Sequence, residues 1–130
     1  MSQQFVGADP NLAEPAFRIF TNVAKAWSLT KLEQSALLGQ SVDDAFALHR
    51  AGIVDGRWAE VLERVSYVIS IYRALHTLFP NPQQANEWIR RPNAAALFRG
   101  EPAVRVICSG RLSDLAEVLD YLDSQGIAAP

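Results

Sequence analysis

The sequence predicts an all-α protein: an N-terminal helix-turn-helix-like bundle joined by a long helix to a small C-terminal helical domain. Three observations predict this arrangement. Apolar residues recur at steps of three and four along most of the 130 residues. Residues that start helices (Thr, Ser, Asn) and residues that stop them (Gly, Pro) separate these stretches. The run "VRVICSG" is rich in β-branched residues, but it lacks a partner strand, so a helix is favoured there.

Pro15 is predicted to lie in the first turn of the first helix, where its missing backbone N–H costs nothing. Phe17, Phe20, Ala24 and Trp27 follow at helical spacing. We therefore expect a helix that ends near residue 27.

Two short helices are predicted between residues 30 and 52. Thr30 and Glu33 can form a capping box at the start of the first helix, and Gly39 can end it. Its apolar face is formed by Leu32, Ala36 and Leu37. Ser41 can cap the second helix, which Gly52 ends.

The longest predicted helix runs from Arg57 to Phe79 and ends ahead of a proline. Its apolar stripe is broad, so it must be covered on more than one side. Either this helix joins two lobes of one chain or it packs against a second copy. Trp58 and Tyr72 in the stripe favour a homodimer. The predicted domains are residues 1–56 and residues 57–130.

A further helix is predicted to start at Asn81, with Pro82 in its first position and Gln84 completing a capping box. It must stop near Arg91, because a residue that precedes a proline avoids the α conformation. Pro92 is that proline.

Three helical pieces are predicted to complete the chain. A short helical turn through Leu97 ends at Gly100, and a short helix follows between Pro102 and Gly110. Ser113 is expected to cap the last helix and Gly126 to close it. The apolar positions of that helix are Leu115, Leu119 and Leu122.

Composition excludes several classes of protein. Charged residues interrupt the apolar runs every few positions, so we expect no membrane span. The first ten residues lack the basic and apolar regions of a secretory signal. A single cysteine, Cys108, rules out an internal disulfide and is consistent with a reducing cytoplasm.

Candidate catalytic and metal-binding groups are scattered. His49, His76 and Cys108 do not have the spacing of metal ligands. Cys108 and Ser109 lack the strand–turn–helix setting of a nucleophile. We therefore expect no enzyme activity, no catalytic residue, no metal and no cofactor.

The two short helices between residues 30 and 52 match the spacing of a helix-turn-helix. In a DNA-binding protein the second helix would present Gln40, Ser41 and Arg50 to operator DNA. Asp43 and Asp44 in its first turn would face phosphates, which is unfavourable. The alternative to a DNA-binding hairpin is a plain helical hairpin.

The stretch "EWIRRPNAAALFRGEPA" carries the pattern W-x3-P-N-x3-L-x2-G-x-P, with a glycine a few residues on. Its members are Trp88, Pro92, Asn93, Leu97, Gly100, Pro102 and Gly110. This pattern resembles the toxin-binding domain of the Xre–MbcA–ParS antitoxins. "AWSLTKLEQSALLG" is similar to the Xre-like helix-turn-helix of the same family, so the resemblance runs from about Phe17 to Gly126.

The resemblance implies an all-helical antitoxin of a type II toxin–antitoxin system that forms oligomers through its C-terminal half. It implies a RES-domain toxin as partner, which degrades NAD or uses it to ADP-ribosylate a target. In this family the C-terminal end of the antitoxin enters the NAD cleft of the toxin, and many members repress their own operon. Asp43 and Asp44 depart from the basic surface expected of a repressor.

The charge pattern gives an independent reason to expect occlusion. Residues 113–130 hold four acids and no base, whereas residues 57–112 hold eight arginines and four acids. A cleft that binds a dinucleotide is rich in cationic and amide donors, which an acidic segment complements. The slim end "GIAAP" could then enter the cleft, with Gly126 releasing it from the helix. The predicted toxin-binding residues are Asp120, Asp123, Gly126, Ile127, Ala128, Ala129 and Pro130, whose terminal carboxylate would add a further anion.

Two other interpretations remain open from the sequence. The C-terminal residues can be a frayed, solvated chain end. The protein can also be a helix-turn-helix transcriptional regulator without a toxin partner. The sequence does not separate NAD degradation from ADP-ribosylation, and it does not fix the stoichiometry of a complex.

Overall fold

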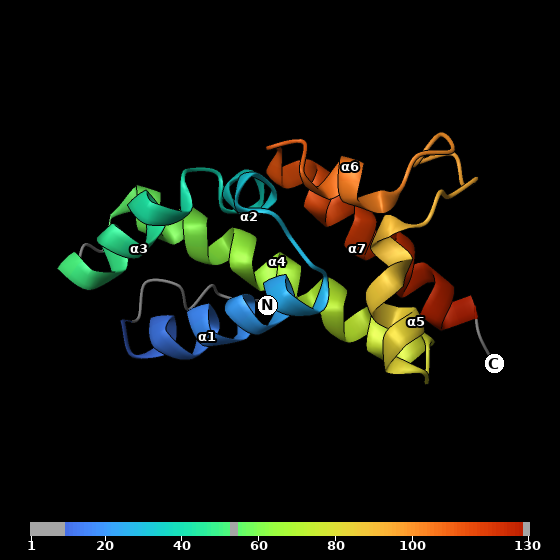
Figure 1. Ribbon diagram of the computed structural model, residues 1–130, viewed down its shortest axis with the longest axis horizontal. Coiled ribbons are helices and arrows are strands. Elements are labelled where there is room, and N and C mark those ends of the chain that lie inside the picture. The colour runs from blue at the N-terminus through green and yellow to red at the C-terminus, as the bar shows by residue number, and fades with distance from the viewer. Residues whose placement is uncertain (1–9, 53–54, 129–130) are drawn as a thin grey trace.

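Helix α4 (Gly56–Leu78) is the axis around which the other helices pack (Figure 1). The computed structural model describes residues 10–52 and 55–128. These residues form helices and turns without a β-strand, which confirms the predicted all-α class. The other elements are α1 (Pro10–Ala26), α2 (Lys31–Leu38), α3 (Val42–Ala51), α5 (Pro82–Glu87), the 3-10 helix η2 (Trp88–Arg90), α6 (Ala103–Ile107) and α7 (Leu112–Ala128).

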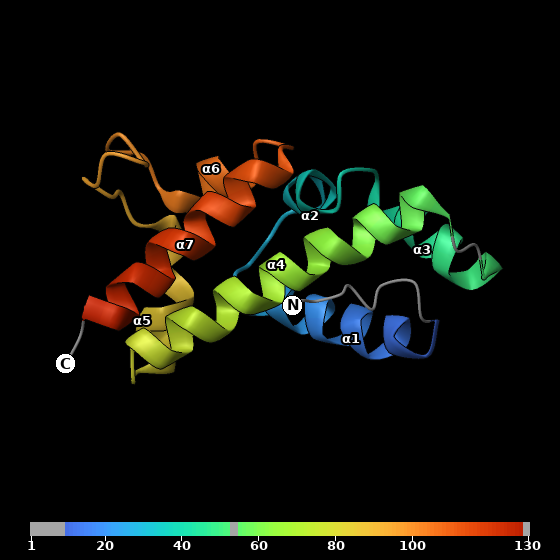
Figure 2. The ribbon, with the colours of Figure 1, turned by 180° about the vertical axis from the view of Figure 1, so that it is seen from behind.

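The broad apolar stripe of α4 is covered within the chain. α1, α2 and α3 pack against it, and so do α5 and α7. Figures 1 and 2 both show α1 and α7 lying alongside α4. Trp58 at its start stacks on Phe17 of α1, with 5.3 Å between ring centroids. α4 therefore joins the two halves of the chain, and its wide stripe needs no second copy to explain it.

The hairpin of α2 and α3 has the predicted caps. The Thr30 hydroxyl accepts a hydrogen bond from the backbone N–H of Glu33, whose carboxylate accepts one from the backbone N–H of Thr30. Gly39 ends α2 in the left-handed conformation, with φ of 78°. The Ser41 hydroxyl caps α3 by accepting from the backbone N–H of Asp44 at 3.0 Å.

Two predictions for the N-terminal half are wrong. α1 begins at Pro10, so Pro15 lies inside the helix rather than at its start. Proline cannot donate the usual backbone hydrogen bond there, but the following turns continue the helix. Leu32 is 83% exposed and does not belong to the apolar face of α2. It precedes the buried Leu37 by five positions, which turns it about 140° around the helix axis.

The helix after α4 ends as the sequence predicts. α5 tightens into η2, and Arg91 is extended with ψ of 139° directly before Pro92. The predicted helical turn through Leu97 to Gly100 is wrong, because residues 95–100 form bends and turns. The "VRVICSG" run is helical in α6, as favoured over a strand.

Both predicted ends of the last helix are wrong. α7 starts at Leu112, so Ser113 lies within its first turn instead of capping it. Ser109 stabilises this start, since its hydroxyl accepts from the backbone N–H of Arg111 and donates to Asp114. Gly126 does not close α7, which runs through Ala128. A glycine inside a helix lowers its stability by about 1 kcal/mol but does not by itself end it.

One hydrophobic core extends from Phe17 in α1 to Leu122 in α7. Residues from every α-helix contribute to it, so the two halves of the chain share their buried surface. Among the helices that the structure describes, none combines the length and the apolar character that crossing a membrane requires.

Candidate functional site

The segment from Trp88 to Gly110 contains a loop that is closed by its own backbone. The N–H of Gly100 donates to the carbonyl of Asn93 at 2.9 Å, and the N–H of Asn93 donates to the carbonyl of Glu101 at 3.3 Å. The Asn93 side chain also accepts from the backbone N–H of Ala95. Gly100 has φ of 82°, a conformation that glycine adopts without a steric penalty.

The other residues of the predicted motif frame this loop. Pro92 and Pro102 pair in an isolated antiparallel bridge, so the two prolines lie across from each other where the loop closes. Trp88 and Leu97 are half-buried against the core. Gly110 turns the chain between α6 and α7, with φ of 93°. The motif therefore has a structural explanation: its residues shape one corner of the fold.

Phe98 attaches the loop to α7, and the sequence analysis missed it. Its side chain is 1% exposed. Its ring meets Trp88 edge-on at 5.7 Å and Tyr121 edge-on at 5.3 Å, between centroids. Tyr121 was missed as well, because in the sequence it lies among the acids of α7. Its contact with Phe98 of the loop is visible only in the fold. Helical periodicity could not have found Phe98, since residues 95–100 are not helical.

α7 separates its apolar and acidic residues. Leu115, Val118 and Leu122 are buried, while Asp120 and Asp123 are exposed. Residues three apart on a helix are neighbours, so these two carboxylates form one acidic surface. Within the described part of the chain, neither aspartate is in an ion pair.

The acids lie in the middle and second half of α7. Asp120 is its central residue and Asp123 lies before its last turn, so the charge at the helix end does not act strongly on either carboxylate. Gly126, Ile127 and Ala128 continue the helical backbone, whereas Ala129 and Pro130 lie outside the described residues. Figures 1 and 2 show that this end of α7 lies at the opposite extreme of the molecule from α3.

Arg90 joins this C-terminal corner to the N-terminal bundle. Its guanidinium forms a two-pronged ion pair with Glu33, at 2.7 and 2.9 Å. The hydrogen bonds from Arg90 hold the pKa of Glu33 below its ordinary value of 4.5, against the smaller opposing effect of burial. No local sequence pattern indicates this pair, because Glu33 and Arg90 are far apart along the chain.

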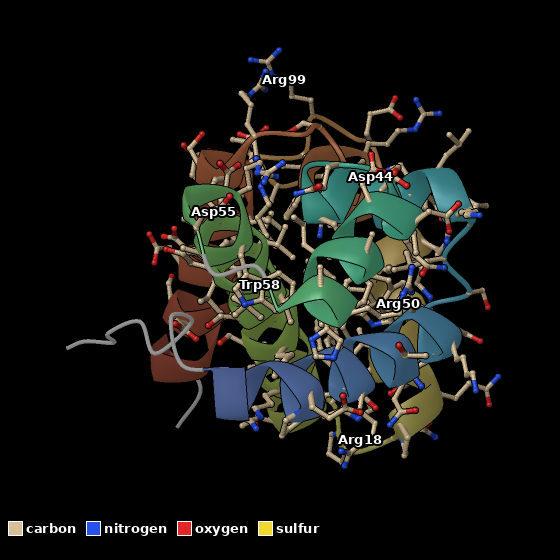
Figure 3. The ribbon with its side chains drawn as sticks, turned by 90° about the vertical axis from the view of Figure 1, so that its left-hand side faces the viewer. Arg18, Asp44, Arg50, Asp55, Trp58 and Arg99 are labelled. Carbon is tan, nitrogen blue, oxygen red and sulfur yellow. The ribbon has the colours of Figure 1, made fainter. Side chains whose placement is uncertain are left out.

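The predicted DNA-contacting residues do not lie together. Gln40 and Ser41 precede α3, whereas Arg50 lies near its other end, about 13 Å further along at 1.5 Å per residue. The Ser41 hydroxyl is engaged in capping the helix. Figure 3 shows Asp44 and Arg50 on different sides of α3, with Arg50 on the side nearer α1. Asp43 is exposed and pairs with Lys31 at 3.3 Å.

The two histidines and the cysteine serve structural contacts. No three or more His, Cys, Asp or Glu side chains within residues 10–52 and 55–128 are grouped so as to hold a metal ion. His49 lies 3.0 Å from Glu14, and His76 lies 2.9 Å from the Asn86 side chain. Burial raises the pKa of the Cys108 thiol to about 12, which keeps it protonated at neutral pH.

These features define a helical protein whose exposed acidic helix end is held by a compact corner motif. Residues 74–125 match the family model described as antitoxin Xre/MbcA/ParS C-terminal toxin-binding domain. The chain is also 35% identical over 108 residues to the uncharacterized protein y4oB of Sinorhizobium fredii (strain NBRC 101917 / NGR234), covering 82% of this chain and 80% of that relative. No solved structure matches significantly. The chain belongs to the Xre/MbcA/ParS antitoxin family.

The matched segment runs from the last turns of α4 to the last turns of α7. It contains the closed loop, Phe98 and the acidic pair Asp120 and Asp123. It stops just before Gly126, so the predicted insertion segment lies beyond the matched residues. As a member of this family, the chain has a toxin-binding antitoxin role.

Proposed function

We propose that this chain neutralises a RES-domain toxin by blocking the toxin's NAD cleft with the C-terminal end of α7. The observation that supports this proposal is the exposed, unpaired acidic surface of Asp120 and Asp123 within a toxin-binding domain. These carboxylates form no ion pair among the described residues and lie outside both end turns of α7, so no contact within the fold accounts for them.

The chemistry of the cleft favours an acidic partner. A site that binds the pyrophosphate of NAD presents Arg, Lys and amide donors, and carboxylates can take the places of phosphate oxygens. Because α7 is helical through Ala128, the segment that enters would be the tip of a helix rather than an unwound strand. The last five residues of the sequence, "GIAAP", carry no charged or aromatic side chain, which suits a narrow opening.

Truncation tests the proposal. Deleting Gly126–Pro130 should weaken inhibition of the toxin's NAD consumption by about tenfold or more, since a few central residues carry most of the energy of an interface. The measurement is inhibition of a purified RES-domain toxin by the purified chain, with circular dichroism to verify that the truncated form is folded. Removing five residues from the N-terminus, Ser2–Val6, is the matched control and should leave inhibition unchanged.

Full inhibition by the truncated chain would exclude occlusion by the tip of α7 while leaving toxin binding elsewhere intact. Absence of any binding by the full chain would exclude the RES-domain partner. Such an antitoxin acts where NAD is consumed, so we place it in the bacterial cytoplasm, without catalytic activity of its own.

Operator binding is the second candidate function, and the helix–turn–helix order of α2 and α3 favours it. It predicts that the isolated protein shifts its own promoter DNA with a steep salt dependence. No shift at low salt would exclude direct autorepression. Self-association stays a prediction that light scattering tests, and a monomeric mass at micromolar concentration would exclude it in the absence of toxin.

A further inference from the structure

Helix α2 is held at both ends by arginines that lie outside the N-terminal bundle. Arg90 of η2 binds at its start, and Arg64 of α4 lies against its end. Both arginines also contact a backbone carbonyl elsewhere in the fold. α2 is only eight residues long, and an isolated helix of that length is not stable in water. Its position therefore depends on contacts with the rest of the fold, which are the burial of Leu37 and Leu38 in the core and the attachments at its two ends.

Arg90 makes the first attachment. Its guanidinium donates to both carboxylate oxygens of Glu33, and also to the carbonyls of Trp27 and Ser28 just after α1. The Glu33 carboxylate also accepts a hydrogen bond from the backbone N–H of Thr30, as part of the capping box at the start of α2. One side chain thus fixes the end of α1, the capping box of α2 and the first turn of the closed-loop segment.

Arg64 makes the second attachment. Its side chain is 8% exposed and donates to Glu60 at 3.0 Å and to the carbonyl of Gly110 at 2.9 Å. The same guanidinium lies so close to Gly39 that a methyl group there would meet Nε at 2.6 Å. The end of α2 is therefore packed on a side chain whose position depends on the turn between α6 and α7.

A third contact lies beside the first, at the start of α2. The Cys108 thiol donates a weak hydrogen bond to the carbonyl of Glu33 at 3.8 Å. Cys108 ends α6, so the toxin-binding domain contacts the first turn of α2 through both Cys108 and Arg90. Packed side chains and hydrogen bonds that connect two regions can carry a displacement from one region to the other.

We infer that α2 is a coupling element: Arg90 and Arg64 are positioning residues through which the toxin-binding domain sets the order and placement of the first helix of the hairpin. A displacement of η2 or of the α6–α7 turn reaches α2 through these two guanidinium groups before it reaches α3. This coupling is a property of the single chain and does not depend on the identity of the toxin.

Amide hydrogen exchange of the full chain tests the coupling. In Arg90→Gln, the amides of residues 34–38 should exchange about tenfold faster, because hydrogen bonds to charged groups are lost and α2 opens locally. Amides of α3 and α7 should change by less than about twofold. Arg91→Gln is the matched control, since Arg91 forms a similar ion pair with Glu87 that does not touch α2.

Three results would overturn the inference: unchanged exchange in α2 of Arg90→Gln, equal acceleration of α2 in Arg91→Gln, or equal acceleration of every helix. Glu33→Gln provides a second variant in case Arg90→Gln does not fold. Glutamine can still serve the capping box but loses the charge that Arg90 binds. The double variant, Arg90→Gln with Glu33→Gln, should exchange the amides of α2 no faster than the faster of the two single variants. If the effects of the two substitutions on exchange added up, Arg90 and Glu33 would act independently.

Discussion

Two pairs of exposed carboxylates differ in how they contribute to the stability of the fold. Asp43 and Asp44 lie in the first turn of α3, where the positive end of the helix dipole favours negative charge, and Asp43 pairs with Lys31. Asp120 and Asp123 lie outside both end turns of α7, where the dipole has little effect, and neither forms an ion pair among the described residues. Folding therefore explains the first pair and not the second. The carboxylates of α7 are therefore the better candidates for a role in binding.

The two regions that carry these pairs also differ in how they are attached to the rest of the molecule. The α2–α3 hairpin is fixed to the rest of the molecule at Gly39, which lies against the buried Arg64. The last part of α7 is free of such contacts as far as the structure describes its side chains, since residues 123–125 are all exposed. Changes in the hairpin should therefore affect stability, and changes at the end of α7 should affect binding.

The largest expected effect tests the attachment of the hairpin. Gly39→Ala should lower the free energy of unfolding by about 3 kcal/mol or more, because alanine is strained at a φ of 78° and its methyl group overlaps Arg64. Arg64 cannot move aside without losing its bond to the Gly110 carbonyl. Urea denaturation followed by circular dichroism measures the loss.

Gly52→Ala is the control for backbone strain. Gly52 has a similar φ of 68°, but a methyl group there would meet no atom within 4 Å. It should cost about 1–2 kcal/mol, which is the strain of the left-handed conformation alone. Equal losses in the two variants would mean that Arg64 does not anchor the hairpin.

The next effect tests the carboxylate pairs directly. Asp120→Asn with Asp123→Asn should weaken toxin binding by about tenfold while leaving the free energy of unfolding unchanged or slightly higher. Asp43→Asn with Asp44→Asn should lower the free energy of unfolding by up to about 1 kcal/mol and leave toxin binding unchanged. Isothermal titration calorimetry with the proposed RES-domain toxin, and urea denaturation, measure the two quantities.

Two outcomes would contradict the expected difference between the carboxylates of α3 and those of α7. If the α3 variant lost toxin affinity as much as the α7 variant, general surface charge would explain binding, and the end of α7 would have no special role. If the α7 variant lost stability instead of affinity, its acids would be structural.

The sequence predicted those parts of the fold that depend on neighbouring residues. The capping box of Thr30 and Glu33, the stop at Gly39 and the extended residue before Pro92 all rest on contacts within a few positions, and the structure confirms them. The family motif was recognised for the same reason, since its spacing is local. Residues 74–125 contain it in full.

The features that the sequence missed depend on distant contacts. Phe98 matters because it meets Tyr121 of α7, and Arg90 matters because it meets Glu33 across the molecule. Periodicity also placed Leu32 in the apolar face, although α2 buries a different side of the helix. No local pattern distinguishes Arg90 from Arg91, yet of these two arginines Arg90 pairs with Glu33 in the N-terminal half and Arg91 pairs with the nearby Glu87.

The smallest expected effect concerns the pH dependence of stability at this junction. Because Arg90 lowers the folded-state pKa of Glu33 below 4.5, deprotonated Glu33 stabilises the fold above that pH. The contribution is lost as pH falls below 4.5 and through the folded-state pKa. The melting temperature of the native chain should therefore fall more steeply than that of Glu33→Gln as pH is lowered from about 6 to about 3.

The comparison with Glu33→Gln isolates a single carboxylate. Asp55 and Glu87 also have lowered pKa values, held by Arg57 for Asp55 and by Gln83 and Arg91 for Glu87. Both remain in the native chain and in the variant, so their acid titration cancels in the difference. Identical melting curves across this range would show that the Arg90 pair contributes no net stability, and α2 would then be held by Arg64 and the apolar core alone.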